Sequence, residues 1–130
     1  AAIFAITISA LSILAGDDVK QTGEDPRRML RQAERHAERG EHEKAEALLA
    51  RVVALQPANT EAKLRLANAL LKQRKLFGAY EASIAVAKAE PKNARAMATL
   101  GAVLVAAGRL NDARQVLFTA LKLDRSEPLA

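Results

Sequence analysis

The chain has 130 residues, of which half are hydrophobic, 27% are charged and 3% are aromatic. A chain of this length can form one domain around a single core. The scarcity of aromatic residues favours helices over strands, and we predict an all-α fold. The absence of cysteine from the sequence excludes disulfides and thiolate chemistry. The net charge of +5 favours acidic proteins, anionic lipid or nucleic acid as partners without choosing among them.

The N-terminal stretch Ala1–Gly16 contains no charged side chain. As a helix it would span about 24 Å, which is less than the ~30 Å hydrocarbon core of a bilayer. No basic residues precede it, as they would in a secretory signal. Because the segment is apolar on every face, we expect it to associate with a membrane. It could be a truncated transmembrane anchor, an uncleaved signal or a helix buried in a membrane complex; a soluble core helix is the alternative.

Residues 17–25 are polar and acidic, and we interpret them as a linker. The range 1–25 holds four acids and one base, so that the range 26–130 carries 19 bases against 11 acids. Five arginines stand at the start of this basic part: Arg27, Arg28, Arg31, Arg35 and Arg39. We interpret the row as a solvated face of arginine and glutamate. The alternative is a contact with anionic lipid or an acidic partner near the linker.

From Pro26 onward the sequence follows a 34-residue period. The period is carried by three alanines and two prolines: Ala45, Ala79, Ala113, Pro57 and Pro91. Asn59 and Asn93 each follow a proline by two residues, where they can cap the next helix. Asp25 before Pro26 provides the same start signal. The repeating units are 26–59, 60–93 and 94–127.

This pattern resembles the tetratricopeptide repeat family, which has small residues at positions 8 and 20 of each unit and proline at position 32. Position 8 holds Ala33, Ala67 and Gly101, and position 20 holds the three periodic alanines. The third unit departs from the pattern with Arg125 at position 32. The resemblance implies three stacked helix hairpins that form an α-solenoid. The expected helices are 26–39, 42–55, 60–73, 76–89, 94–107 and 110–123.

The resemblance also implies that the first helix of each unit lines a concave groove. The groove residues that we expect to bind a partner are Arg27, Leu30, Arg31, Arg65, Asn68, Lys72 and Arg95. Leu30, Leu64, Leu71 and Val105 would form an apolar floor. The positions that grip a chaperone-tail carboxylate in one subclass mostly hold other residue types here. The groove therefore better suits a peptide or helix with apolar anchors and some acidic residues.

The residues needed for catalysis are not evident in the sequence. His36 and His42 lie six residues apart on either side of Gly40 and occupy packing positions of the repeat. We interpret both as structural rather than metal-binding, because a metal site needs three or four ligands. No glycine-rich phosphate loop is present in the sequence. We therefore predict a protein that is not an enzyme and needs no metal or cofactor.

The last unit is followed by too few residues for a capping helix. On the sixth helix we expect Leu110, Ala113, Leu117, Ala120 and Leu121 to pack inward. Val116, Phe118 and Leu123 would then lie at the open end and contact another chain.

The leading functional hypothesis is a membrane-tethered adaptor that binds or scaffolds another protein, in a bacterial envelope complex such as a pilus or secretion machine. A structural subunit of a large membrane complex is the first alternative. A basic surface for anionic lipid or nucleic acid is the second, although nucleic acid is disfavoured because no aromatic residue lies among the dispersed bases. The side of the membrane is left open.

Overall fold

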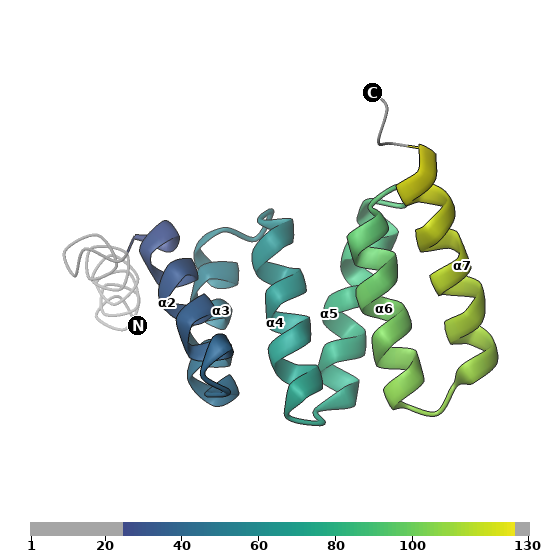
Figure 1. Ribbon diagram of the computed structural model, residues 1–130. Helices are drawn as coiled ribbons and strands as arrows, with labels where there is room; N and C mark the ends of the chain where they lie inside the picture. The colour runs from purple at the N-terminus through teal and green to yellow at the C-terminus, as the bar shows by residue number, and fades with distance from the viewer. Residues whose placement is uncertain (1–24, 127–130) are drawn as a thin grey trace, which may run out of the picture.

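The computed structural model describes residues 25–126 and shows six α-helices in this range (Figure 1). Their bounds are α2 Pro26–Glu38, α3 His42–Leu55, α4 Thr60–Lys72, α5 Leu76–Ala89, α6 Ala94–Ala106 and α7 Leu110–Ser126. No strand occurs in the described range, and the predicted all-α fold is confirmed. The first five helices match their expected bounds to within one residue.

The helices form three consecutive hairpins that stack side by side along the array (Figure 1). Each helix packs on its neighbours in the sequence, and α4 also touches α6. Close packing within a hairpin requires small side chains where two helices cross, and the alanines at position 20 are fully buried there. The largest core cluster joins the second and third hairpins: Leu64, Val86, Ala87, Ala96, Leu100, Leu104 and Ala113.

Polar side chains cap the first helix of each hairpin as the sequence predicts. The side-chain oxygens of Asn59 and Asn93 accept hydrogen bonds from the backbone N–H groups of Ala62 and Ala96, each at 3.0 Å. Asp25 accepts from Arg27 N–H in the same way. These bonds satisfy donors that the first turn of a helix leaves unpaired.

The turn inside each hairpin needs a left-handed residue. Gly40 and Gly108 have φ of 78° and 79°, a region that glycine enters without a steric penalty. At the equivalent place of the second hairpin stands Arg74, with φ of 63°. Because Cβ crowds the following carbonyl in this conformation, Arg74 costs the fold about 1–2 kcal/mol.

Proline positions explain why α7 is longer than expected. The helices α3 and α5 end two residues before Pro57 and Pro91, whose rings cannot continue a helix. Position 125 is arginine instead, and α7 runs on to Ser126 rather than ending at residue 123.

The apolar segment 1–16 and most of the acidic linker 17–25 lie outside the described residues. Among the helices between residues 25 and 126, none combines the length and the apolar character that crossing a membrane requires.

Candidate functional site

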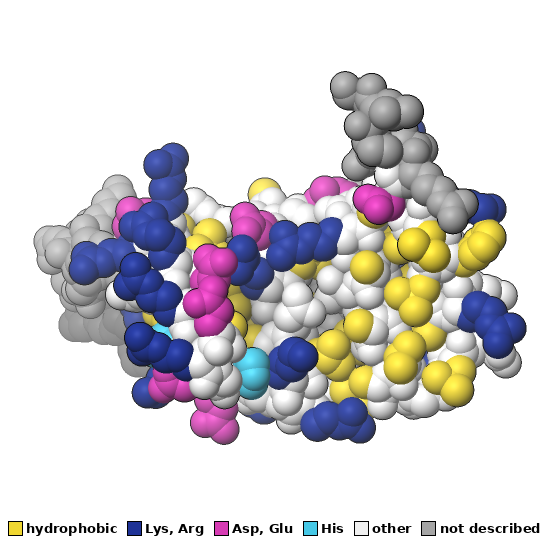
Figure 2. Space-filling view, viewed as in Figure 1, with side chains coloured by type: hydrophobic (Ala, Val, Ile, Leu, Met, Phe, Trp, Pro, Cys, Tyr) yellow, Lys and Arg dark blue, Asp and Glu magenta, His cyan; other side chains and the backbone are white. Residues whose placement is uncertain are grey.

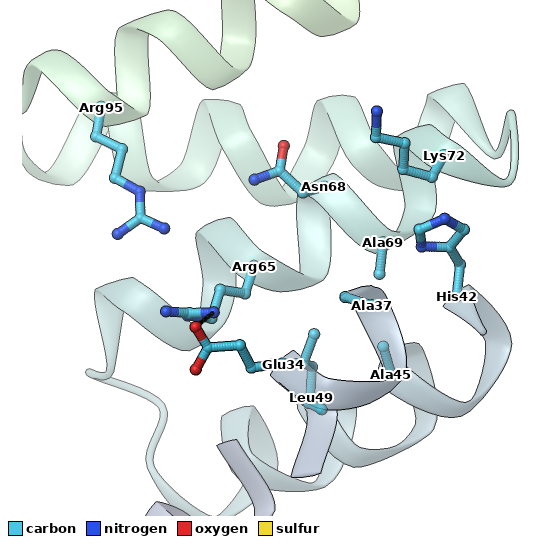
Figure 3. A pocket seen from close by; sticks show the side chains of 11 residues that line it. Glu34, Ala37, His42, Ala45, Leu49, Arg65, Asn68, Ala69, Lys72 and Arg95 are labelled. Atoms are coloured by element: carbon cyan, nitrogen blue, oxygen red, sulfur yellow. Dashed lines mark ion pairs between the residues drawn. The ribbon is translucent and has the colours of Figure 1, made fainter. Parts of the chain in front are cut away.

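The concave face contains a hollow between the first and second hairpins (Figure 3). Its volume is about 380 Å³. Eleven residues line it: Ala33, Glu34, Ala37, His42, Ala45, Leu49, Arg65, Asn68, Ala69, Lys72 and Arg95. Because the same pattern recurs in every repeat, equivalent side chains of α2, α4 and α6 face the same side of the array. The hollow is therefore a consequence of the stacking rather than of one loop.

Arginine and lysine dominate the charged part of the hollow. Arg65 is held in place by Glu61, at 2.9 Å, and by Glu34 of the preceding repeat, at 4.0 Å. Lys72 and Arg95 are exposed, and neither has an ion-pair partner within residues 25–126. Their side chains come from different helices and border the same space (Figure 3). Glu34 is the only acid among the described residues that line the hollow, so this lining carries excess positive charge.

Asn68 lies between these two cations along the concave face (Figure 3). It is exposed, and no hydrogen bond occupies its amide in the described part of the chain. A carboxamide offers both donors and an acceptor, and it can pair with the backbone of a bound peptide.

His42 at the start of α3 lies beside Ala69 and Lys72 at the edge of the hollow (Figure 3). Its Nδ1 atom is buried and has no hydrogen-bond partner among the described residues. A buried polar atom without a partner costs about 1–3 kcal/mol. Sequence reasoning assigned this histidine to packing and missed its place in the hollow. The available signal was a histidine at a repeat position that normally carries a large apolar residue.

The structure brings four of the seven expected groove residues together at the hollow: Arg65, Asn68, Lys72 and Arg95. Arg27 and Arg31 are exposed on α2 and do not line it. Leu30 is half-buried, packs against the core of the first hairpin and does not line the hollow. Leu64 is likewise buried in the core. Sequence reasoning missed Leu49, which reaches the hollow from α3.

Beyond Arg95, the exposed face of α6 is apolar. Ala98 and Ala102 are exposed, and Val105 is 47% exposed on the same side of the helix. Figure 2 shows the resulting contrast, with charged side chains over α2 and α4 and hydrophobic ones over α6 and α7. The concave face therefore changes from charged to apolar along the array.

The helix α7 exposes a different set of residues from the one expected. Leu110, Phe118 and Leu121 are 63%, 59% and 58% exposed, so the expectation that both leucines pack inward is wrong. Val116 is half-buried against the main core cluster rather than free at the open end, and Leu123 is half-buried.

The helical period explains this arrangement of α7. Residues that meet α6 recur at steps of three and four, which gives the stripe Ala113, Val116, Leu117 and Ala120. Phe118 lies outside that stripe, with the Lys122 ammonium 4.8 Å from the centre of its ring.

Comparison with known proteins agrees with this architecture. A model of the tetratricopeptide repeat matches residues 36–82 and 78–130. The chain belongs to the tetratricopeptide repeat family. No curated protein matches it at a significant level.

Several solved structures share the fold of these tetratricopeptide repeats. MamA 41-end from Desulfovibrio magneticus RS-1 is 26% identical with a TM-score of 0.72, over 84% of this chain and 62% of that one. The second TPR of Spaghetti (RPAP3) bound to the HSP90 peptide SRMEEVD is 24% identical with a TM-score of 0.70, over 82% and 98%. The second TPR domain of human RPAP3 with the HSP70 peptide SGPTIEEVD is 23% identical with a TM-score of 0.69, over 80% and 90%. The chain thus spans less than two thirds of that MamA chain.

Proposed function

We propose that this chain is an adaptor that holds a peptide or helix of another protein in the hollow of its concave face. The observation that carries the proposal is the pair Lys72 and Arg95, which lie on opposite sides of Asn68 and have no ion-pair partner among the described residues. Cations of this kind form charge-assisted hydrogen bonds with carboxylates, and these bonds are about twice as strong as neutral ones. Tetratricopeptide repeats are generally protein-interaction modules. The prediction that the chain is not an enzyme agrees with this proposal.

The ligand that fits this surface has acidic residues next to small apolar anchors. Acidic side chains would meet Lys72 and Arg95, while the apolar anchors would lie over Ala102 and Val105 of α6. The paired Arg65 contributes less, because Glu34 and Glu61 already compensate its charge.

Selection of displayed random peptides on the full chain tests the adaptor. Peptides recovered in the selection are titrated by fluorescence anisotropy against the wild type and the variant Lys72→Glu/Arg95→Glu. A matched control, Lys88→Glu/Arg114→Glu, makes the same charge change at exposed positions outside the hollow. We expect the hollow variant to lose affinity about tenfold or more and the control to keep it. Recovery of no peptide that depends on the hollow would contradict the proposal.

We further propose that the apolar segment 1–16 tethers the adaptor to a membrane, in a bacterial envelope complex such as a pilus or secretion machine. The support is the uncharged sequence of the segment followed by an acidic linker. Fractionation of cells that express the full chain and a chain lacking 1–25 tests the tether. We expect the first in the membrane fraction and the second, still helical, in the supernatant. Equal partition of the two would contradict the tether.

A second candidate, a structural subunit of a larger complex, is favoured by the exposed apolar side chains of α7. Phe118 and Leu121 stand one repeat after Ile84 and Ala87, which pack in the core cluster shared with α6. Phe118 and Leu121 therefore occupy the repeat positions at which the second repeat packs against the third. The fitting occupant is a helix of a neighbouring subunit that packs across α7 as α6 packs across α5. Hydrogen exchange on the native assembly should show protection along residues 110–123, and full exposure of Phe118 and Leu123 would exclude this candidate.

A further inference from the structure

The outer face of α2, at the N-terminal end of the array, differs from the same face of α4 and α6. The 34-residue register aligns Arg28 with Ala62 and Ala96, and Arg35 with Ala69 and Val103. The four later residues are buried between repeats. Both arginines are exposed. The face that is apolar and buried on α4 and α6 thus carries exposed guanidinium groups on α2.

Two more residues complete this face. Gln32 aligns with Leu66 and with the buried Leu100, and Arg39 aligns with Gln73. Both Gln32 and Arg39 are exposed. We call the set Arg28, Gln32, Arg35 and Arg39 the arginine face. Another repeat or apolar helix would have to bury these guanidinium groups without partners, which makes such packing unfavourable.

The arginine face borders a cleft of about 470 Å³ between α2 and α3 of the first hairpin. The described residues that line it include no acid: Gln32, Arg35, His36, Arg39, Lys44, Ala47 and Leu48. The neighbouring acid Glu41 already interacts with two of these lining residues, Lys44 and His36. Its carboxylate accepts a hydrogen bond from Lys44 at 2.9 Å and lies 3.2 Å from His36 Nδ1.

These two contacts compensate the charge of Lys44 but not that of the arginines. The hydrogen bond from Lys44, and then that from His36, hold the pKa of Glu41 below its ordinary value. The guanidinium groups of Arg28, Arg35 and Arg39 have no ion-pair partner among the described residues. Figure 2 shows the Lys and Arg side chains gathered at this end of the molecule. Within the described residues, no ion pair therefore offsets the charge of these three guanidinium groups.

We propose that the arginine face binds the anionic surface of a membrane. Arginine suits phosphate groups because its planar fork donates two parallel hydrogen bonds. The chain order supports a membrane over a soluble acidic protein, because only the short linker 17–25 separates the uncharged stretch Ala1–Gly16 from α2. A short apolar attachment such as one lipid chain gives weak membrane binding, and a basic patch provides the second signal that stable attachment needs. The hollow does not include these arginines, so the inference stands apart from peptide binding.

Co-sedimentation of the full chain with vesicles tests the arginine face. Vesicles of pure phosphatidylcholine are compared with vesicles that contain roughly 30% phosphatidylglycerol. The test variant is Arg28→Gln/Arg35→Gln/Arg39→Gln. The control Lys88→Gln/Lys92→Gln/Arg114→Gln removes the same charge from exposed positions elsewhere. Circular dichroism verifies that each variant is folded.

We expect anionic lipid to raise the affinity of the wild type and of the control, and the test variant to lose that increase by on the order of 10- to 100-fold. Added salt should reduce the increase, because the charges are exposed. An equal increase for test variant and wild type would overturn the proposal, as would no increase for the wild type. Tighter binding to single-stranded RNA than to anionic vesicles, with the same dependence on the three arginines, would overturn it in favour of nucleic acid.

Discussion

Replacement of Gly101 by alanine should destabilise the third hairpin, although alanine is the better helix former. Gly101 lies in the interior of α6, where α7 packs against it. A Cβ atom added at this position would lie 2.6 Å from Cγ of Leu117, well inside van der Waals contact. Because Cγ is the branch point of the leucine, rotation of a terminal methyl cannot relieve the overlap, and the side chain or the helix must move.

The size of the effect follows from two opposing terms. Gly→Ala inside a helix gains about 1 kcal/mol from helix propensity. Overpacking a close helix contact costs about 1–3 kcal/mol. The net result is a loss of about 1 kcal/mol and at most about 2 kcal/mol, and each kcal/mol lowers the melting temperature by about 4–8 °C in a domain of this size.

Gly78 in α5 provides the matched control. A Cβ there would meet a terminal methyl of Leu70 at 3.3 Å, which a small rotation relieves. Gly78→Ala should therefore keep most of its propensity gain and stabilise the chain by about 0.5–1 kcal/mol. The two substitutions are chemically identical, so an opposite sign isolates the contact with Leu117.

The same substitution in a chain that lacks the Leu117 side chain tests whether Leu117 is the residue that clashes. The second repeat has Ala67 and Ser83 where the third has Gly101 and Leu117. Ser83 fits there because its hydroxyl donates to the backbone carbonyl of Ala79, at 2.9 Å. In a Leu117→Ser chain, Gly101→Ala should become stabilising by about 1 kcal/mol.

Thermal and urea unfolding followed by far-UV circular dichroism measure all of these variants. A Gly101→Ala chain that is stabilised as much as the Gly78→Ala chain would refute the reasoning. It would show that Leu117 moves without cost to an arrangement like that of Leu49, which packs in one cluster with Ala33 in the first repeat.

Three further predictions concern local features of the first two hairpins. His42→Leu should stabilise the chain by about 1 kcal/mol and raise the melting temperature, because it removes the buried Nδ1 atom that has no partner among the described residues. A lower melting temperature would show that the imidazole forms a hydrogen bond. Arg74→Gly should stabilise the chain by about 0.5–1 kcal/mol in urea unfolding by relieving the left-handed backbone, and a loss would show that the flexibility of glycine dominates. Glu41 has a pKa below its usual 4.5, so its stabilisation is present above that pH and is lost as the pH falls through the lowered value. Glu41→Gln should therefore reduce stability at neutral pH and leave it nearly unchanged in strong acid, whereas an equal loss at both pH values would contradict the linkage.

Local signals in the sequence determined the elements of this fold. The asparagine caps and the prolines are read from neighbouring residues, and they locate helix starts and ends without knowledge of the packing. The missing proline at position 125 is such a signal, because without it α7 continues to Ser126. The small residues at positions 8 and 20 likewise predict where the helices cross, because only they allow close approach.

The tertiary structure decided which side chains remain exposed. Leu121 and Ala87 occupy the same repeat position, yet Ala87 is buried under the next repeat and Leu121 has none over it in the described range. Exposure of a residue thus depends on which helix follows it, and the helical period alone does not contain that information. The hollow also depends on tertiary packing. His42 and Leu49 of α3 border the same space as α4 because of the angle at which the first two hairpins pack. That angle arises from the sum of many side-chain contacts, and no single sequence position specifies it.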